Sequence, residues 1–296
     1  MIIGSDVEFF VRNSLGDVIP AYTVIDHDKN DPIVNQDIKL YYDNVLLEFN
    51  IPPCKSIREF IENIESGINF AESKIRPHFL DTSASTYFSP EFMSDSRSQV
   101  VACDIEYNAY NMQPNYFIQD ALKNTSMRTS GGHLHLSGVS SDSISDKTKY
   151  PLFVYMLDLF LGISSLLVEK DQTQKDRRKF FGKAGSFRIK PYGIEYRVLS
   201  SWWTRKPEYC GLVYRICEFV FEFMNNDMWQ KFWTFNVDNL YNCDPSQAYE
   251  CFGYDLNFVT KTINECDYKS AEVLFNFISN FMPNDIVEEI NFQIKK

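Results

Sequence analysis

The first fifty residues alternate between apolar and polar positions, which is the pattern of β-strands. Residues 2–11 predict one strand, and residues 18–25 and 40–51 predict two more. Pro52 and Pro53 are expected to end the last of these strands, because proline has no N–H group to donate to a sheet.

Further strands are predicted at residues 133–138, behind a Gly-Gly pair, and at 186–190 and 194–200, which a Pro-Tyr-Gly turn joins. Between these groups of strands, residues 82–118 are expected to be irregular with short strands.

Helical periodicity begins after Ser56, which forms a capping box with Glu59. A second helix is expected over residues 151–170; it contains Asp158 and is shorter in apolar length than the roughly 20 residues of a membrane span, which favours a buried helix. The pattern is mainly helical from residue 207 onward. Strands with covering helices, and neither a repeat nor a linker, predict one α+β domain.

Composition narrows the function classes. The 296 residues carry 29 Lys and Arg against 40 Asp and Glu, a net charge of −11, and 44% are hydrophobic. Such a chain is too apolar to be disordered, and its acidity does not favour binding to nucleic acid or to an anionic membrane. The seven cysteines lack a CxxC pair and the chain does not start like a signal peptide. We therefore expect a cytoplasmic protein without a disulfide framework or zinc knuckle.

One segment opposes this acidity. Residues 170–206 hold eleven Lys and Arg residues against three acids. A solvated basic face is the plain interpretation of such a run. Because these residues alternate with Gly, Phe and Pro in a predicted hairpin, a local anion site is the alternative that we favour.

Four predicted strand regions place ionisable or amide side chains on one face and apolar side chains on the other, since residues i and i+2 of a strand point the same way. These polar positions are Asp6 and Glu8, then Asn44, Glu48 and Asn50, then His133 and His135, and finally Arg188, Lys190, Glu195 and Arg197. A sheet with one solvated face gives a similar pattern. Two of only four histidines in one short strand are not typical of such a face, so we predict a site.

The chemistry of these side chains indicates metal-dependent phosphoryl transfer. Crowded carboxylates repel one another unless a cation neutralises them, and Mg²⁺ takes oxygen ligands, whereas an imidazole ligand suits Mn²⁺. Guanidinium and ammonium groups beside such a centre are what a polyphosphate requires. A classical phosphate-binding loop, a GxSxG motif and a kinase signature are all absent from the sequence.

Four motifs together resemble the phage-type carboxylate-amine ligases, the amidoligases similar to those of phiEco32-like phages. The motifs are GSDVEFF, DNVLLEFNIPP, GGHLHLSG and FGKAGSFRIKPYGIEYRVLSSWW, and they span residues 1–205 in order. This family belongs to the superfamily of glutamine synthetase and glutamate-cysteine ligase. The resemblance implies a glutamine synthetase-like α+β fold with a curved, mostly antiparallel sheet, a catalytic concave face and covering helices. Residues 1–296 then form a single domain, in which 206–296 is a mainly helical C-terminal layer.

The resemblance also implies roles for individual residues. The expected metal ligands are Asp6, Glu8, Glu48, Asn50, His133 and Glu195. The expected ATP-binding residues are His133, His135, Lys183, Arg188, Lys190 and Arg197, and the expected catalytic residues are Arg188, Glu195 and Arg197. Two departures from the family pattern are Asp6, where many relatives have Glu, and Asp26-His27-Asp28, where a glycine-rich approach to Lys29 is expected.

The implied reaction transfers the γ-phosphoryl group of ATP to a carboxylate, with Mg²⁺ or Mn²⁺, and an amine then converts the acyl phosphate into an amide. Loops 26–36 and 82–98 are candidate lids, and Asp104 or Glu106 is a candidate base. The carboxylate belongs to a small molecule, a peptide or a protein terminus. A homo-oligomer, and the host cytoplasm if a phage encodes the protein, are further expectations.

Two alternatives stay open at this point. A metal-dependent hydrolase or nuclease also uses carboxylates and histidines, but it acts without ATP and does not need the basic hairpin. A phage binding protein on the same fold would keep the sheet and lack the chemistry.

Overall fold

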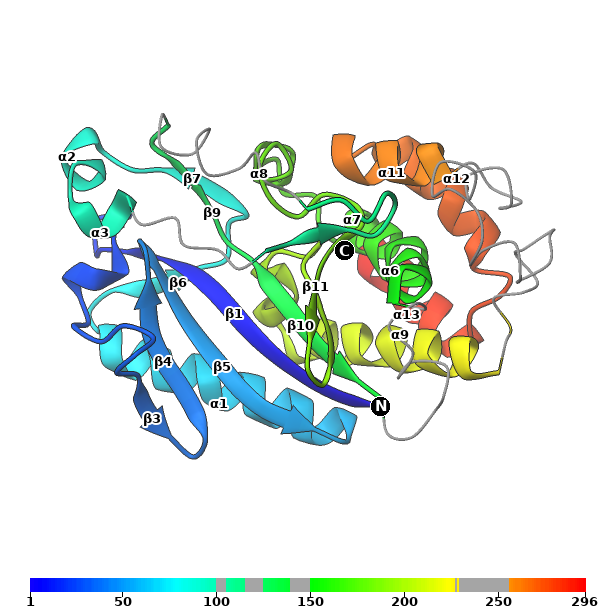
Figure 1. The fold of residues 1–296 in the computed structure, drawn as a ribbon, viewed down its shortest axis with the longest axis horizontal. Coiled ribbons are helices and arrows are strands. Elements are labelled where there is room, and N and C mark those ends of the chain that lie inside the picture. Colours follow the sequence, from blue (N-terminus) through cyan, green and yellow to red (C-terminus); the bar gives the residue numbers. More distant parts are fainter. Residues whose placement is uncertain (100–104, 115–124, 139–149, 227, 229–255) are drawn as a thin grey trace.

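The computed structural model describes residues 1–99, 105–114, 125–138, 150–226, 228 and 256–296. Its centre is an antiparallel sheet of ten strands among these residues, built around the long strand β1 (Ile2–Arg12) (Figure 1). The strand order is β3 (Ile33–Asn35), β4 (Ile38–Asp43), β5 (Leu46–Cys54), β1, β10 (Gly132–Ser137), β12 (Gly193–Tyr196), β11 (Ser186–Lys190) and β8 (Tyr107–Asn108), with β2 (Val18–Ile19) and β6 (Phe79–Asp81) also paired to β1. The predicted α+β class with a mostly antiparallel sheet is confirmed.

The predicted strand over 18–25 is wrong beyond Ile19, because Pro20 caps a short 3₁₀ helix, η1 (Ala21–Thr23). The predicted strand over 40–51 is a hairpin of β4 and β5, and Asn44 in its two-residue turn has φ of 56°.

Strand β5 also continues through the two prolines that were expected to end it. Beyond Asn50, the only pairing of β5 within the described part of the chain is with β1, and its register shifts between Ile3 and Ser5. Pro52 and Pro53 have no N–H group, and at such an irregular edge the sheet does not require a ladder hydrogen bond from them.

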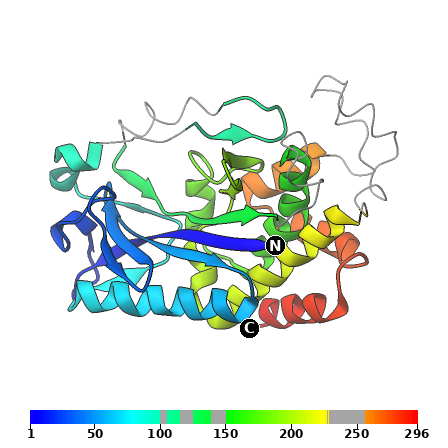
Figure 2. The ribbon, with the colours of Figure 1, turned by 60° about the horizontal axis from the view of Figure 1, so that its bottom comes forward.

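The long helix α1 (Ile57–Ile75) starts at the predicted capping box, where Ser56 Oγ accepts a hydrogen bond from Glu59 N at 3.2 Å. It packs against β5, and a Cβ atom at Gly67 would lie 2.5 Å from the Phe49 ring, so only glycine permits this approach. Helix α9 (Pro207–Asn225) runs along the same side of the sheet, as Figure 2 shows. Helix α1 therefore covers the apolar face over β4 and β5, with α9 packed beside it.

The buried helix predicted over 151–170 is confirmed as α6 (Tyr150–Leu157), a π-helical segment η3 (Asp158–Gly162) and α7 (Ile163–Val168). This stretch is long and apolar enough to cross a membrane, but 89% of it is buried in the structure, which is the pattern of a core helix. Helices α11 (Leu256–Glu265), α12 (Tyr268–Ile278) and α13 (Asn284–Ile294) pack against α7 and follow the helical pattern predicted from residue 207 onward. Residues 227 and 229–255 of that predicted part lie outside the described residues.

The region predicted as irregular is more regular than expected where it is described. Strand β7 (Ser85–Tyr87) pairs with β9 (Met127–Thr129), and the short helices α2 (Pro90–Met93) and α3 (Ser96–Gln99) follow β7. Residues 100–104 and 115–118 of this region lie outside the described residues.

The strand predicted over 194–200 ends at Tyr196, before the 3₁₀ helix η4 (Ser201–Arg205). The carbonyl groups of Arg197, Val198 and Leu199 all accept hydrogen bonds from one guanidinium, that of Arg177 in α8 (Thr173–Arg177). Successive residues of an extended strand point in opposite directions, so these three residues cannot continue β12.

Candidate active site

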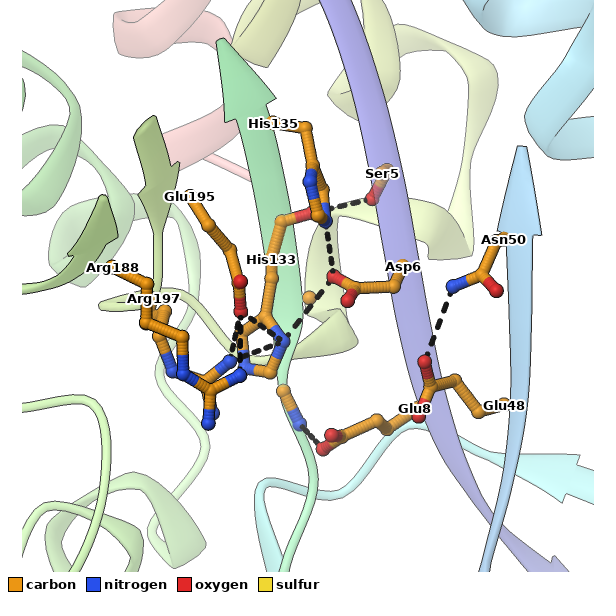
Figure 3. A network of polar contacts seen from close by, with 12 residues as sticks. Ser5, Asp6, Glu8, Glu48, Asn50, His133, His135, Arg188, Glu195 and Arg197 are labelled. Carbon is orange, nitrogen blue, oxygen red and sulfur yellow. Dashed lines mark hydrogen bonds and ion pairs between the residues drawn. The ribbon is translucent and has the colours of Figure 1, made fainter. Parts of the chain in front are cut away.

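The strand register brings the predicted polar positions to one face of the sheet. Asp6 lies opposite both His133 on β10 and Asn50 on β5, and Glu8 lies opposite Glu48. The register continues across the sheet, because Glu195 on β12 lies opposite both His135 and Arg188. Residues directly opposite each other on antiparallel strands share a face. Figure 3 shows these side chains pointing toward one another from neighbouring strands.

At the centre of this face lie Asp6, His133 and Glu195, each of which offers one ligand atom within 4.8 Å of the others. Asp6 Oδ1 is 3.3 Å from His133 Nδ1 and 3.1 Å from His135 Nε2. His133 Nδ1 is 3.8 Å from Glu195 Oε1. Two carboxylates and an imidazole at this spacing form a donor set that suits Mg²⁺ or Mn²⁺.

The Glu195 side chain is fully buried among cationic groups. Its Oε1 accepts a hydrogen bond from Arg188 Nη1 at 3.2 Å and one from Arg197 Nη1, and its Oε2 lies 2.9 Å from Lys190 Nζ. Burial raises the pKa of Glu195, but the charges of Arg197, His133 and Arg188 together outweigh this effect and lower the pKa to about 2. Glu195 is therefore ionised at neutral pH.

Asp6 is also held in its charged form. Burial alone raises the pKa of Asp6, but the nearby charges of His135 and His133 hold it well below its ordinary value. The charged forms of Asp6 and His135 thus stabilise each other.

A second, more acidic part of the face lies on β1 and β5. Glu8 Oε2 accepts a hydrogen bond from the backbone N–H of Gly131 at 2.5 Å. Glu48 Oε1 accepts from Tyr41 at 2.5 Å and from Asn50 at 3.2 Å.

Burial raises the pKa of both glutamates, and the negative charges of Asp6 and Glu8 add to the rise at Glu48. Among the described residues, no basic side chain forms an ion pair with either carboxylate. This part of the site is unfavourably negative by itself, which fits a bound cation.

Other predicted residues lie at the edge of this face or away from it. Lys183 is half-buried in the loop before β11, and none of the contacts of the described residues joins its side chain to the cluster. The expectation that Asn44 shares a face with Glu48 is wrong, because Asn44 lies in the turn and its Nδ2 donates to Ser98 O at 2.9 Å. Glu106 accepts from Arg197 Nε at 2.8 Å, whereas Asp104 lies outside the described residues.

Sequence reasoning missed two tyrosines in the site. Tyr41 was missed because residues 40–51 were predicted as one strand, whereas they form a hairpin. The Asp-Asn pair at 43–44 is a signal that could have indicated the turn. Tyr192 lies in the β11–β12 turn, where its hydroxyl contacts His135 Nδ1 and the two rings lie 5.9 Å apart. No pattern along the chain indicates that contact.

A mostly antiparallel sheet with carboxylates, imidazoles and guanidiniums on one face is the arrangement expected of a carboxylate-amine ligase. Residues 123–253 match the sequence model of a family described as phage phiEco32-like COOH.NH2 ligase-type 2. The match confirms the predicted resemblance over this segment and supports the ligase class. It includes His133, Glu195 and Arg197, while Asp6 and Glu48 precede it.

Among solved structures, the chain is similar to the crystal structure of a bifunctional glutathione synthetase from Pasteurella multocida, with a TM-score of 0.49 and 11% sequence identity. The alignment covers 99% of this chain and 46% of that chain, so the protein spans about half the length of that structure. No curated protein sequence matches the chain.

Proposed function

We propose that the protein is an ATP- and Mg²⁺-dependent carboxylate-amine ligase that forms an amide through an acyl phosphate. The observation that supports this function best is the cluster of Asp6, His133 and Glu195 with three basic side chains at Glu195. A cation centre and guanidinium groups on one face are the two requirements for holding a triphosphate.

Two cation positions are proposed on this face. Asp6, His133 and Glu195 would hold one, and Glu8 and Glu48 would hold another. When bound, Mg²⁺ would neutralise charge on the phosphate oxygens during transfer.

The basic residues have a separate task. Arg188, Lys190 and Arg197 would bind the phosphates, and Glu195 keeps their charges together before ATP arrives. Arg197 also donates to Glu106 and lies 3.2 Å from His133 Nδ1, so its guanidinium is fixed in orientation. Preorganised donors of this kind stabilise the charge that spreads over the transferring phosphoryl group.

The reaction would proceed in two displacements. A carboxylate oxygen of the first substrate bonds to the γ-phosphorus while the bond from that phosphorus to the bridging oxygen of ADP breaks. The amine nitrogen of the second substrate then bonds to the acyl carbon, phosphate leaves, and the nitrogen loses a proton. Glu106 is the candidate proton acceptor among the described residues.

The test is incubation of the purified protein with ATP, Mg²⁺ and pooled amino acids and short peptides, followed by mass spectrometry. Ligation predicts condensation products that have lost one water, with one ADP formed for each product. Breakdown of phosphodiesters or peptides without ATP would instead indicate the hydrolase or nuclease alternative. Absence of both activities in folded protein would favour the non-catalytic binding protein.

A further inference from the structure

The Arg177 side chain is only 1% exposed, although it lies outside the cluster that would bind metal and phosphate. Its guanidinium donates to four backbone carbonyls. Nε donates to Ser130 O at 2.8 Å, Nη1 to Val198 O at 2.7 Å, and Nη2 to Leu199 O at 2.8 Å and to Arg197 O at 3.2 Å. No carboxylate forms an ion pair with Arg177 within the described part of the chain.

These carbonyls belong to the two segments that carry the site. Ser130 precedes Gly131, whose N–H binds the Glu8 carboxylate, and it leads into the strand that bears His133. Arg197 and the two residues after it extend from the strand that bears Glu195. A single guanidinium therefore joins the start of β10 to the end of β12.

Gly182 holds the guanidinium in place from the other side. Its φ is 67°, and a Cβ atom built there would lie 1.6 Å from Arg177 Nη1. The neighbouring Arg178 fixes this glycine by donating from Nη1 to Gly182 O. The glycine is thus required both by its backbone conformation and by its contact with Arg177.

Chemistry explains why an arginine occupies this position. Burial lowers the pKa of Arg177 to about 9, which still leaves it charged at neutral pH. A buried charge is costly unless hydrogen bonds satisfy it. A planar guanidinium offers five donors in a fixed fork, whereas a lysine offers three donors from one atom and cannot span both segments.

We propose that Arg177 is a positioning residue that fixes the start of β10 and the end of β12 relative to each other, and so sets the geometry of Glu8, His133 and Arg197 toward metal and nucleotide. The inference rests on the proposed function for what these groups bind. The relative placement of the two segments is a property of the fold and can be measured separately.

Two variants test the proposal in the full-length protein. Arg177→Lys keeps the charge and removes the fork, and Gly182→Ala keeps the arginine but displaces its guanidinium. The matched control is Arg128→Lys, because Arg128 is also buried and donates to backbone carbonyls, those of Thr125, Met127 and Ser98. Amide hydrogen exchange is followed in peptides covering residues 132–136, which begin at the Gly132 N–H that donates to Leu199 O, and 194–200, together with the affinity for Mn²⁺ in the presence of ATP.

Both test variants should exchange faster in these two peptides than the wild type, and the control should not. Their Mn²⁺ affinity should fall by about 10- to 100-fold, the loss usual when a group that orients metal ligands is removed. Unchanged exchange in both peptides in a folded Arg177→Lys protein would overturn the proposal. If the wild type itself fails to bind Mn²⁺ with ATP, the proposed function fails, and the exchange result still decides the role of Arg177.

Discussion

Asp6 and His133 face each other across the paired strands β1 and β10, with Asp6 Oδ1 at 3.3 Å from His133 Nδ1. The two residues are far apart in the sequence and each belongs to a short polar motif. Each motif alone is weak evidence for a site, but the pairing of the two strands brings both motifs into one candidate metal centre.

Glu48→Gln should stabilise the metal-free protein. Burial and the charges of Asp6 and Glu8 disfavour the ionised form of Glu48, and glutamine keeps an acceptor for Tyr41 without the charge. We expect the free energy of unfolding in a chelator to rise by about 1 kcal/mol. Mn²⁺ affinity should fall more than about tenfold, since a charged ligand is lost. Denaturant unfolding and metal titration measure the two effects, and a destabilised variant with unchanged affinity would refute the assignment.

Glu195→Gln should abolish ATP turnover and also lower the melting temperature. The substitution leaves Arg188, Lys190 and Arg197 close together without the anion that they share. Removing one partner of a buried pair typically costs about 3–5 kcal/mol. Glu218→Gln, at an exposed position on α9, is the control for both measurements. Turnover at the wild-type rate in folded Glu195→Gln would exclude a metal role for this residue.

Arg197→Lys should impair nucleotide binding more than Arg188→Lys does. Arg197 uses separate nitrogens for Glu106 and for Glu195, which a lysine cannot reproduce, whereas Arg188 has a single hydrogen bond to Glu195. Titration with Mg²⁺·ATP compares the two variants. Equal affinities of the two variants would contradict the predicted difference, and an Arg197→Lys protein that binds like the wild type would show that charge alone matters at position 197.

Asp158 should make stability fall as the pH rises from about 4 to about 6. Burial raises the pKa of Asp158 to about 6 from 3.8, despite hydrogen bonds from Tyr196 and Tyr110. The folded state therefore holds a proton that the unfolded state has lost over this range. Above about pH 6, ionisation of buried Asp158 lowers the free energy of unfolding by about 3 kcal/mol. In Asp158→Asn this contribution should vanish, so the difference in unfolding free energy between pH 4 and pH 7 should change by that amount. Identical pH profiles for the two proteins would contradict the shift.

Much of the site could be predicted from local pattern, because alternation along a strand decides which side chains share a face. Glu48 and Asn50, His133 and His135, and Glu195 and Arg197 were placed in this way. The register that sets Asp6 opposite His133 depends on pairing between distant segments, which one sequence does not report. The hairpin before Glu48 was missed because apolar residues flank its turn.

Arg177 shows a different limit. Along the chain it is one of several basic residues in a run, and nothing distinguishes it from its solvated neighbour Lys179. The fold shows that Arg177 donates hydrogen bonds to three successive carbonyl groups. Because those carbonyl groups point to one side, the predicted strand does not continue beyond Tyr196.

The most direct test of the account is pulsed electron paramagnetic resonance of Mn²⁺ bound to the protein together with ATP. The account predicts that one Mn²⁺ ion shows coupling both to an imidazole nitrogen and to phosphorus, and that His133→Ala removes the nitrogen coupling. Phosphorus coupling without nitrogen coupling, or a nitrogen signal unchanged in His133→Ala, would contradict a nucleotide-bearing metal centre at Asp6, His133 and Glu195.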